Sequence, residues 1–384
     1  MLTDWGKRIM QVPPSGNEAH VGAKPETETR MVKQGFPNEQ GLQLGAGPLL
    51  TMLHVSDLHF VAELTEEGRR LWGKQFVRSH SFAKIYALAQ TLYDLQRTGT
   101  QIDITMVTGD ISTDGSKESL QTALNFIGEA DIHRQGRLIS KGLAAPAGKR
   151  VVIPGNHDRY STGLIPIQTG STNLEDVFHA PQKYPYAMGF PGKASENEAS
   201  VILFVFDSTL PDWTDAPIIS RIAQGKVLDA ECDWLVSQSH EIARKNMVET
   251  YHGRQLNCTE ATPRVALLHH HPIQVQVSDS KLTRLRNGEK FVEACFRAKI
   301  NLVLFGHEHV EYFESKHQRG HNVHFMCCPS TSEYKSDPAG FFVLNLHERG
   351  FQVSVYHWQK ATGIFGHINE HSVLWADQTL QAIR

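Results

Sequence analysis

The chain has 384 residues, of which 40% are hydrophobic and 21% are charged, and its net charge is −3 with histidine neutral. This is the composition of a globular protein, and the length allows one large α/β unit with appended segments. The slightly negative charge excludes an overall basic field that would gather nucleic acid nonspecifically. No apolar run approaches about 18 residues, which excludes a conventional transmembrane helix.

The first segment, residues 1–48, is polar and rich in glycine and proline, as in "VPPSGNEAH". We expect a flexible leader here, because such a composition cannot bury a core. The segment lacks a charged region followed by an apolar stretch, so it gives no secretory signal. The five cysteines form no CxxC pair, which argues against a disulfide framework or a structural zinc site. The cytoplasm is therefore the expected compartment.

From residue 49 onward, short apolar runs alternate with patterns of helical spacing. Helices are predicted over 82–96 and 119–130. Strands are predicted over 49–57, 102–110, 150–158, 200–209, 264–272 and 300–309. The late segments 322–331 and 340–358 lack an intervening helix and predict a β-meander. This alternation of strands and helices favours a layered α/β fold built around a sheet.

Two polar stretches, 159–199 and 244–263, interrupt this rhythm. Both are rich in glycine, proline, serine or asparagine, and we expect surface insertions that form loops or a partial lid. Residues 361–384 are expected to form a C-terminal tail. One domain over 49–360 then accounts for the rest of the chain.

Polar side chains follow five of the predicted strands, in the stretches "HVSDLHF", "VTGDIS", "IPGNHD", "LLHHHP" and "FGHEHV". Ligands bind outside the carboxyl ends of the strands in open α/β sheets. Each stretch alone is readily explained as a turn or a helix start. Their joint occurrence, each after an apolar run, indicates a metal site. Oxygen and imidazole donors without thiolates are preferred by Mn²⁺, Fe and Zn²⁺.

These five blocks resemble the calcineurin-like metallophosphoesterase superfamily, whose pattern runs DxH, GD, GNHD/E, a histidine before a proline, and GHxH. The resemblance spans roughly residues 50–360 and leans towards its cyclic-nucleotide-phosphodiesterase branch. It implies an α/β fold in which a layered sandwich of two mixed β-sheets is flanked by helices. It also implies a dinuclear metal site at the C-terminal ends of the strands.

By this resemblance, Asp110 is the carboxylate shared by two divalent ions, which would be Mn, Fe or Zn. The remaining expected metal ligands are Asp57, His59 and His309 for one ion, and Asn156, His270 and His307 for the other. His270 matches the position two residues before Pro272, which leaves His269 and His271 as neighbours rather than ligands.

The resemblance implies a metal-dependent phosphoester hydrolase, and a phosphodiesterase in particular. A metal-bridging hydroxide would attack phosphorus in line, because metal ions lower the pKa of bound water. The expected catalytic residues are His157 and Asp158. The His157 imidazole could donate to a phosphoryl oxygen or protonate the leaving alkoxide, and Asp158 could orient that ring. A helix-starting carboxylate is the alternative role for Asp158.

Four further residues are weaker candidates. Asp114 follows Asp110 by four residues where three is commoner in the superfamily, so it departs from the spacing that implies a supporting role. Asp207 ends a predicted strand, and we expect it to have a structural role. Arg159 and Tyr160 are candidates for substrate selectivity by position only.

Other functions remain open at this point. A DNA or RNA nuclease and a phosphomonoesterase are alternatives on the same fold, and the charge does not favour nucleic acid. A non-catalytic scaffold that binds a partner is an alternative of another class, but it would be expected to have replaced ligands. The expected partner is a phosphate-ester substrate such as a cyclic nucleotide, and no membrane partner is expected. The motifs determine neither the substrate, the metal nor the oligomeric state.

Overall fold

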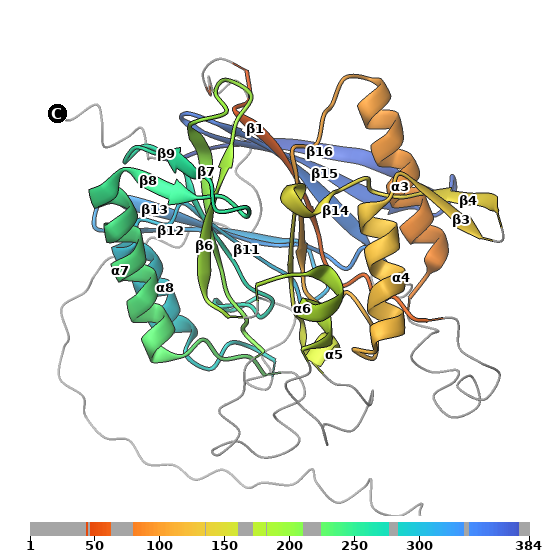
Figure 1. Ribbon diagram of the computed structural model, residues 1–384, viewed down its shortest axis with the longest axis horizontal. Coiled ribbons are helices and arrows are strands. Elements are labelled where there is room, and N and C mark those ends of the chain that lie inside the picture. The colour runs from red at the N-terminus through yellow and green to blue at the C-terminus, as the bar shows by residue number, and fades with distance from the viewer. Residues whose placement is uncertain are drawn as a thin grey trace, which may run out of the picture.

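The computed structural model describes residues 44, 47–62, 80–134, 136–159, 172–181, 183–209, 224–275, 283–333 and 338–375 (Figure 1). Almost all of the expected leader lies outside these residues. Within them, the chain forms two six-stranded mixed sheets and two short hairpins. The expected α/β sandwich of two mixed sheets flanked by helices is confirmed.

The first sheet combines parallel strands from the start of the chain with a meander from its end. In spatial order its strands are β16 (Ile364–Leu374), β15 (Gly350–Gln359), β14 (Gly340–His347), β1 (Leu50–Val55), β2 (Ile104–Thr108) and β5 (Arg150–Ile153). Strands β1, β2 and β5 are parallel, whereas β14 runs antiparallel to β1. The carboxyl ends of β1, β2 and β5 therefore share one edge.

The second sheet repeats this design with strands from the middle of the chain. Its order is β12 (Tyr312–Gln318), β13 (His321–Cys327), β11 (Leu302–Phe305), β10 (Arg264–Leu267), β7 (Ala199–Val205) and β6 (Tyr186–Pro191). Strands β7, β10, β11 and β13 are parallel. Two small hairpins lie outside both sheets, β3–β4 (Asp131–Arg134 and Arg137–Lys141) and β8–β9 (Met247–Glu249 and Gln255–Asn257).

Helices cover the outer faces of both sheets. Figure 1 shows α3 (Phe82–Arg97) and α4 (Lys117–Gly128) on one side, and α7 (Asp229–Lys245) and α8 (Gly288–Arg297) on the other. The short helices are α5 (Asn156–Arg159), α6 (Asn173–Phe178) and the 3₁₀ turn η2 (Ala147–Lys149). Central strands such as β1 are buried at every position, because sheet packs on one face and helix on the other.

Three apolar clusters hold these layers together. One lies between the sheets and includes Met52, Leu203 and Phe342. A second joins the first sheet to α3 and α4, and a third joins the second sheet to α7 and α8. Because both sheets pack tightly on their neighbours, the loops at their carboxyl ends are held on rigid strands.

Three segments contain more regular structure than the sequence pattern indicated. The stretch 159–199 contains α6 and β6, and 244–263 contains the β8–β9 hairpin. The expected tail contains β16, which pairs along its length with β15. Both β6 and β16 are edge strands, where a proline or a polar outer face is tolerated. Their apolar pattern is correspondingly weak.

Candidate metal centre

Most of the expected ligands occupy the same place relative to their strands. Asp57, Asp110 and His307 each stand two residues beyond the last residue of β1, β2 and β11 respectively. Asn156 stands three residues beyond the end of β5, after the bend at Gly155. Since three of these strands belong to the first sheet and one to the second, the two sheets contribute side chains to one edge.

The first group of donor atoms comes from Asp57, His59 and His309, whose nearest ligand atoms lie within 4.8 Å of one another. His309 Nε2 lies 3.2 Å from Asp57 Oδ1. Both ring nitrogens of His59 are buried and have no hydrogen-bond partner among the described residues. Buried polar atoms are rarely left unsatisfied, and the one ring nitrogen of His59 that carries no proton suits a bound cation.

The second group centres on His269. Its Nε2 atom lies 3.2 Å from Asn156 Oδ1, 3.2 Å from His307 Nδ1 and 3.4 Å from Asp110 Oδ2. The same Asp110 oxygen lies 3.9 Å from His59 Nε2 of the first group. Asp110 Oδ1 instead accepts a hydrogen bond from the backbone N–H of His157. Asp110 Oδ2 therefore faces both groups, as expected of a shared carboxylate.

The geometry favours His269 over the expected His270 as the ligand from this loop. His269 Nδ1 lies 2.8 Å from the carbonyl oxygen of Thr108. A carbonyl only accepts, so Nδ1 carries a proton, and Nε2, which faces the oxygens of Asp110 and Asn156, is the atom left to bind a cation. The resemblance places the ligand at His270, two residues before Pro272. Counting two residues forward from the end of β10 selects His269, and that rule also holds for β1, β2 and β11.

His270 has the opposite arrangement. Its Nδ1 atom lies 2.9 Å from Ser208 Oγ, and this oxygen also accepts the backbone N–H groups of His269 and His270. With both acceptor positions used, the hydroxyl donates to Nδ1 and leaves the proton of His270 on Nε2. That tautomer has no free lone pair for a cation. His270 Nε2 is nevertheless buried without a hydrogen-bond partner among the described residues and lies in one group with His269 and His307, so His270 stays a predicted ligand beside the better placed His269. His271 lies beside Glu308, 3.4 Å from its Oε1.

The electrostatics of the centre require positive charge. Burial alone raises the pKa of Asp110, but the neighbouring His269, His157 and His59 outweigh it and hold the pKa well below its usual range. Burial lowers the pKa of His307 to about 3 and that of His59 well below its usual value. Burial also opposes protonation of His269, yet Asp110 and Asp57 raise its pKa to about 9. Burial likewise opposes protonation of His309, yet Asp57 raises its pKa well above the usual value, so protonated His269 and His309 supply the counter-charge that bound metal ions would replace.

The backbone carries strain at five of these residues. Asp57, His59, Asp110, His307 and His309 all have positive φ, between 48° and 76°. This conformation is uncommon outside glycine, costs on the order of 1 kcal/mol or more per residue, and clusters at functional sites. It turns successive side chains of one loop towards the same centre.

The glycines of the motifs are required by close approach between loops. A Cβ atom at Gly155 would lie 2.1 Å from Asp110 Oδ1. One at Gly109, where φ is +90°, would lie 2.3 Å from the Nδ1 atom of His269. Any larger residue at these positions would displace a ligand.

His157 and Asp158 have different surroundings. His157 is half-buried, its Nδ1 lies 3.1 Å from the carbonyl of Thr113, and its ring centroid lies 5.0 Å from that of His59. The carbonyl fixes the proton on Nδ1 and leaves Nε2 free to meet a substrate. The Thr113 carbonyl, not Asp158, orients this ring.

Asp158 is fully buried and holds the loop after β2. Its carboxylate accepts the backbone N–H groups of Ile111, Ser112 and Gly155, and the hydroxyl of Ser112. Its oxygens are engaged in these bonds, which indicates a structural role, and its part in catalysis stays a prediction. The sequence did not indicate Ser112 as a partner of Asp158, because the two residues are 46 positions apart in the chain.

Of the weaker candidates, Tyr160 lies outside the described residues and the others have structural contacts. Asp114 Oδ1 accepts from the N–H and hydroxyl of Ser116 at the start of α4, so it does not reach the centre. Arg159 is buried and forms ion pairs with Glu175 and Asp207. This excludes the free guanidinium that a role in substrate selectivity would need, and it gives Asp207 the structural role expected of it.

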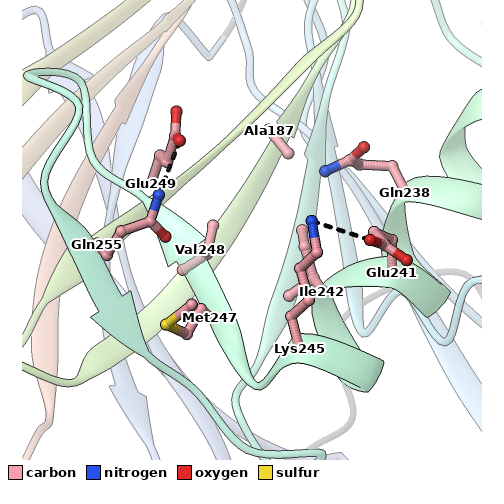
Figure 2. Close-up of a pocket in the computed structure, with 9 residues that line it drawn as sticks. All are labelled: Ala187, Gln238, Glu241, Ile242, Lys245, Met247, Val248, Glu249 and Gln255. Carbon is pink, nitrogen blue, oxygen red and sulfur yellow. Dashed lines mark hydrogen bonds and ion pairs between the residues drawn. The ribbon is translucent and has the colours of Figure 1, made fainter.

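A separate cavity of about 360 Å³ lies between the end of α7, strand β6 and the β8–β9 hairpin (Figure 2). Its charged groups and one of its amides are paired, since Lys245 bonds to Glu241 and Gln255 to Glu249. None of the candidate ligands lines it. The metal centre remains the part of the described structure with chemistry to explain.

Comparison with known proteins agrees with the geometry. The family model of the calcineurin-like phosphoesterases matches residues 50–311, which span β1 to the GHEH loop and contain every candidate ligand. The chain belongs to this family. It is thus a hydrolytic metallophosphoesterase, and the non-catalytic scaffold considered from the sequence is set aside.

Two bacterial relatives match the sequence of this phosphoesterase along most of their length. A protein of Synechococcus sp. named "probable cyclic nucleotide phosphodiesterase" is 24% identical over 67% of this chain and 76% of its own. A 3′,5′-cyclic-nucleotide phosphodiesterase of Nostoc sp. is 22% identical over 79% of this chain and 86% of its own.

Among solved structures, a dimetal phosphatase from Danio rerio has the same fold. It superposes with a TM-score of 0.51 at 12% identity, covering 86% of this phosphoesterase and 100% of the other chain. In the part of the chain that the structure describes, no helix has the length and apolar character needed to cross a membrane.

Proposed function

We propose that this phosphoesterase binds two divalent cations and hydrolyses phosphodiesters, with cyclic nucleotides as the substrate class. The observation that carries the proposal is the position of Asp110 Oδ2 between imidazole nitrogens of two separate groups. The names of the two bacterial relatives support the choice of cyclic nucleotides.

The first ion would be held by the Asp57, His59 and His309 group, and the second by Asn156, His269 and His307, with Asp110 common to both. Oxygen and imidazole donors suit Mn, Fe or Zn, and thiolate ligands are absent from these groups. When bound, two such ions supply an acidified water as the nucleophile and positive charge for the phosphoryl oxygens.

The chain's own residues bind and orient the reacting groups. The Asn156 amide adds a neutral oxygen donor, so the centre keeps more positive charge for an anionic substrate than a third carboxylate would allow. His157 presents Nε2 at the edge of the first group, where a protonated imidazole can donate its proton to the leaving alkoxide. Asp158 holds the loops that carry Asp110 and Asn156.

The test is a hydrolysis panel with added Mn²⁺ across cyclic nucleotides, bis(p-nitrophenyl) phosphate, p-nitrophenyl phosphate and single-stranded DNA. We expect turnover of the first two. Asn156→Ala and His269→Ala should lose most of it, whereas His317→Ala, an exposed residue of β12 bonded to Asn322, should retain it. Unchanged rates in both ligand variants would contradict the dinuclear assignment. Turnover of the monoester or of DNA alone would favour the corresponding alternative.

The choice among Mn, Fe and Zn stays a prediction, to be settled by elemental analysis of protein purified without added metal. The cytoplasmic location expected from the sequence also stays a prediction.

A further inference from the structure

The outward side of His309 is held by a residue outside all five motifs. Glu333 follows β13, 24 residues after His309, and its Oε2 atom lies 2.8 Å from His309 Nδ1. An ionised carboxylate only accepts hydrogen bonds, so Nδ1 carries the proton. The other ring nitrogen, Nε2, faces Asp57 Oδ1, 3.2 Å away, and is the atom left to bind a cation between the two side chains. This is the nitrogen that faces the first metal group.

We propose that Glu333 is a positioning residue for the first metal site, which it serves by fixing the tautomer and orientation of His309. The inference rests on the proposed two-metal function. The physical reason is general: an imidazole ligand whose second N–H is bound by a carboxylate is held in place and becomes a more basic ligand.

The backbone around Glu333 is fixed to a second segment of the chain. His80 and Glu333 form an antiparallel bridge, and the N–H of Ser81 donates to the carbonyl of Ser332 at 2.8 Å. Lys84 Nζ donates to the carbonyl of Glu333, and the N–H of Glu333 donates to Ser330 Oγ at 3.1 Å. Glu333 is thus held at both of its backbone polar groups.

The same segment also holds Asp57 and His59. Ser330 Oγ and Ser332 Oγ donate to the carbonyl of Asp57 at 2.9 and 3.0 Å. Because the Ser332 hydroxyl is used in this way, its oxygen accepts from Nδ1 of His80, 2.8 Å away. The His80 ring in turn stacks on the His59 ring, with centroids 3.8 Å apart. All three residues of the first group are therefore supported from this one side.

The substitution Glu333→Gln isolates the charge, because it keeps the size of the side chain while replacing the carboxylate with a neutral amide. Loss of such a partner lowers metal affinity about 10–100-fold. Glu311→Gln is a matched control. Glu311 makes the same kind of contact, 2.5 Å from Nε2 of His357, and that histidine belongs to neither metal group.

The experiment titrates metal-free full-length protein with Mn²⁺ by calorimetry, and then with Co²⁺ while recording its visible absorption. Both are repeated in a His269→Ala background, where the first site alone is expected to remain. We expect Glu333→Gln to weaken the first site about 10–100-fold and to change its Co²⁺ spectrum, and Glu311→Gln to leave both unchanged.

The role of Glu333 and the proposed two-metal function can be refuted separately. Wild-type protein that binds two ions, with a Glu333→Gln variant that binds both equally well, would overturn the role of Glu333 alone. Wild-type protein that binds no ion would overturn the proposed function and this inference with it. If Glu333→Gln does not fold, Glu333→Asp serves instead, since its shorter chain also loses the contact at 2.8 Å.

Discussion

Replacing Arg159 with methionine tests whether the residue after the GNHD motif stabilises the fold or contacts substrate. Its guanidinium donates to both oxygens of Glu175, at 2.8 and 2.6 Å, and from Nε to Asp207 at 3.0 Å. The three residues are 6%, 3% and 1% exposed. The variant therefore leaves two carboxylates buried without their cation.

The expected effect is large. Removing one partner of a buried ion pair costs about 3–5 kcal/mol, because the remaining charge stays desolvated. For a protein of this size that loss lowers Tm by on the order of 5–15 °C. Lys117→Met is the control. Lys117 pairs with Asp176 of the same helix as Glu175, but both side chains are exposed, and such pairs contribute about 0–1 kcal/mol.

The assays are thermal unfolding and steady-state kinetics below the unfolding transition. We expect Arg159→Met to lower Tm while KM changes little, and the further changes Glu175→Gln and Asp207→Asn to recover part of the loss. A normal Tm combined with a raised KM would refute the reasoning and return Arg159 to the substrate site.

Three other predictions follow from the site and its supports. His269→Ala should reduce bound Mn²⁺ from two ions to one, whereas His270→Ala should retain both ions. Elemental analysis of the reconstituted variants measures this. The reverse result would show that His270 is the ligand, as the resemblance implies. Gly155→Ala should weaken metal binding and destabilise the protein by about 1–3 kcal/mol, because the added Cβ atom would collide with Asp110 Oδ1. Unchanged metal binding in this variant would show that the loop can shift. Burial raises the pKa of Glu231 from 4.5 to about 7. Between these pH values the folded state holds a proton on Glu231 that the unfolded state has lost. The free energy of unfolding should therefore fall as pH rises from 4.5 to about 7, by on the order of 1 kcal/mol per pH unit. Urea unfolding at pH 5 and 7 should show this slope, and Glu231→Gln should lack it.

The strain at the centre explains why the motifs are short and closely spaced. In "SDLH" and "GHEH" two candidate ligands are separated by one residue, and both ligands of each pair adopt positive φ. An extended loop would also place both side chains on one side, but it would continue away from the strand end. The left-handed turns keep the chain at the edge of the sheet and direct both imidazoles or carboxylates inward.

The sequence by itself determined the strands, their polar ends and the type of chemistry. Apolar runs such as "LLTMLHV" and "INLVLF" predict buried strands because burial depends on a local pattern. Since parallel strands bring their carboxyl ends together, the polar residues after them identify the site before its geometry is known. The donor types, oxygen and imidazole nitrogen, likewise indicate the class of metal.

Only the tertiary structure decided which partner each side chain has. His269 and His270 are adjacent in the sequence, and their surroundings differ because one faces the carbonyl of Thr108 and the other the hydroxyl of Ser208. The pairings of Glu333 with His309 and of Arg159 with Asp207 likewise join distant parts of the chain. Such contacts depend on how loops on different strands approach one another, and no local period in the sequence encodes that distance.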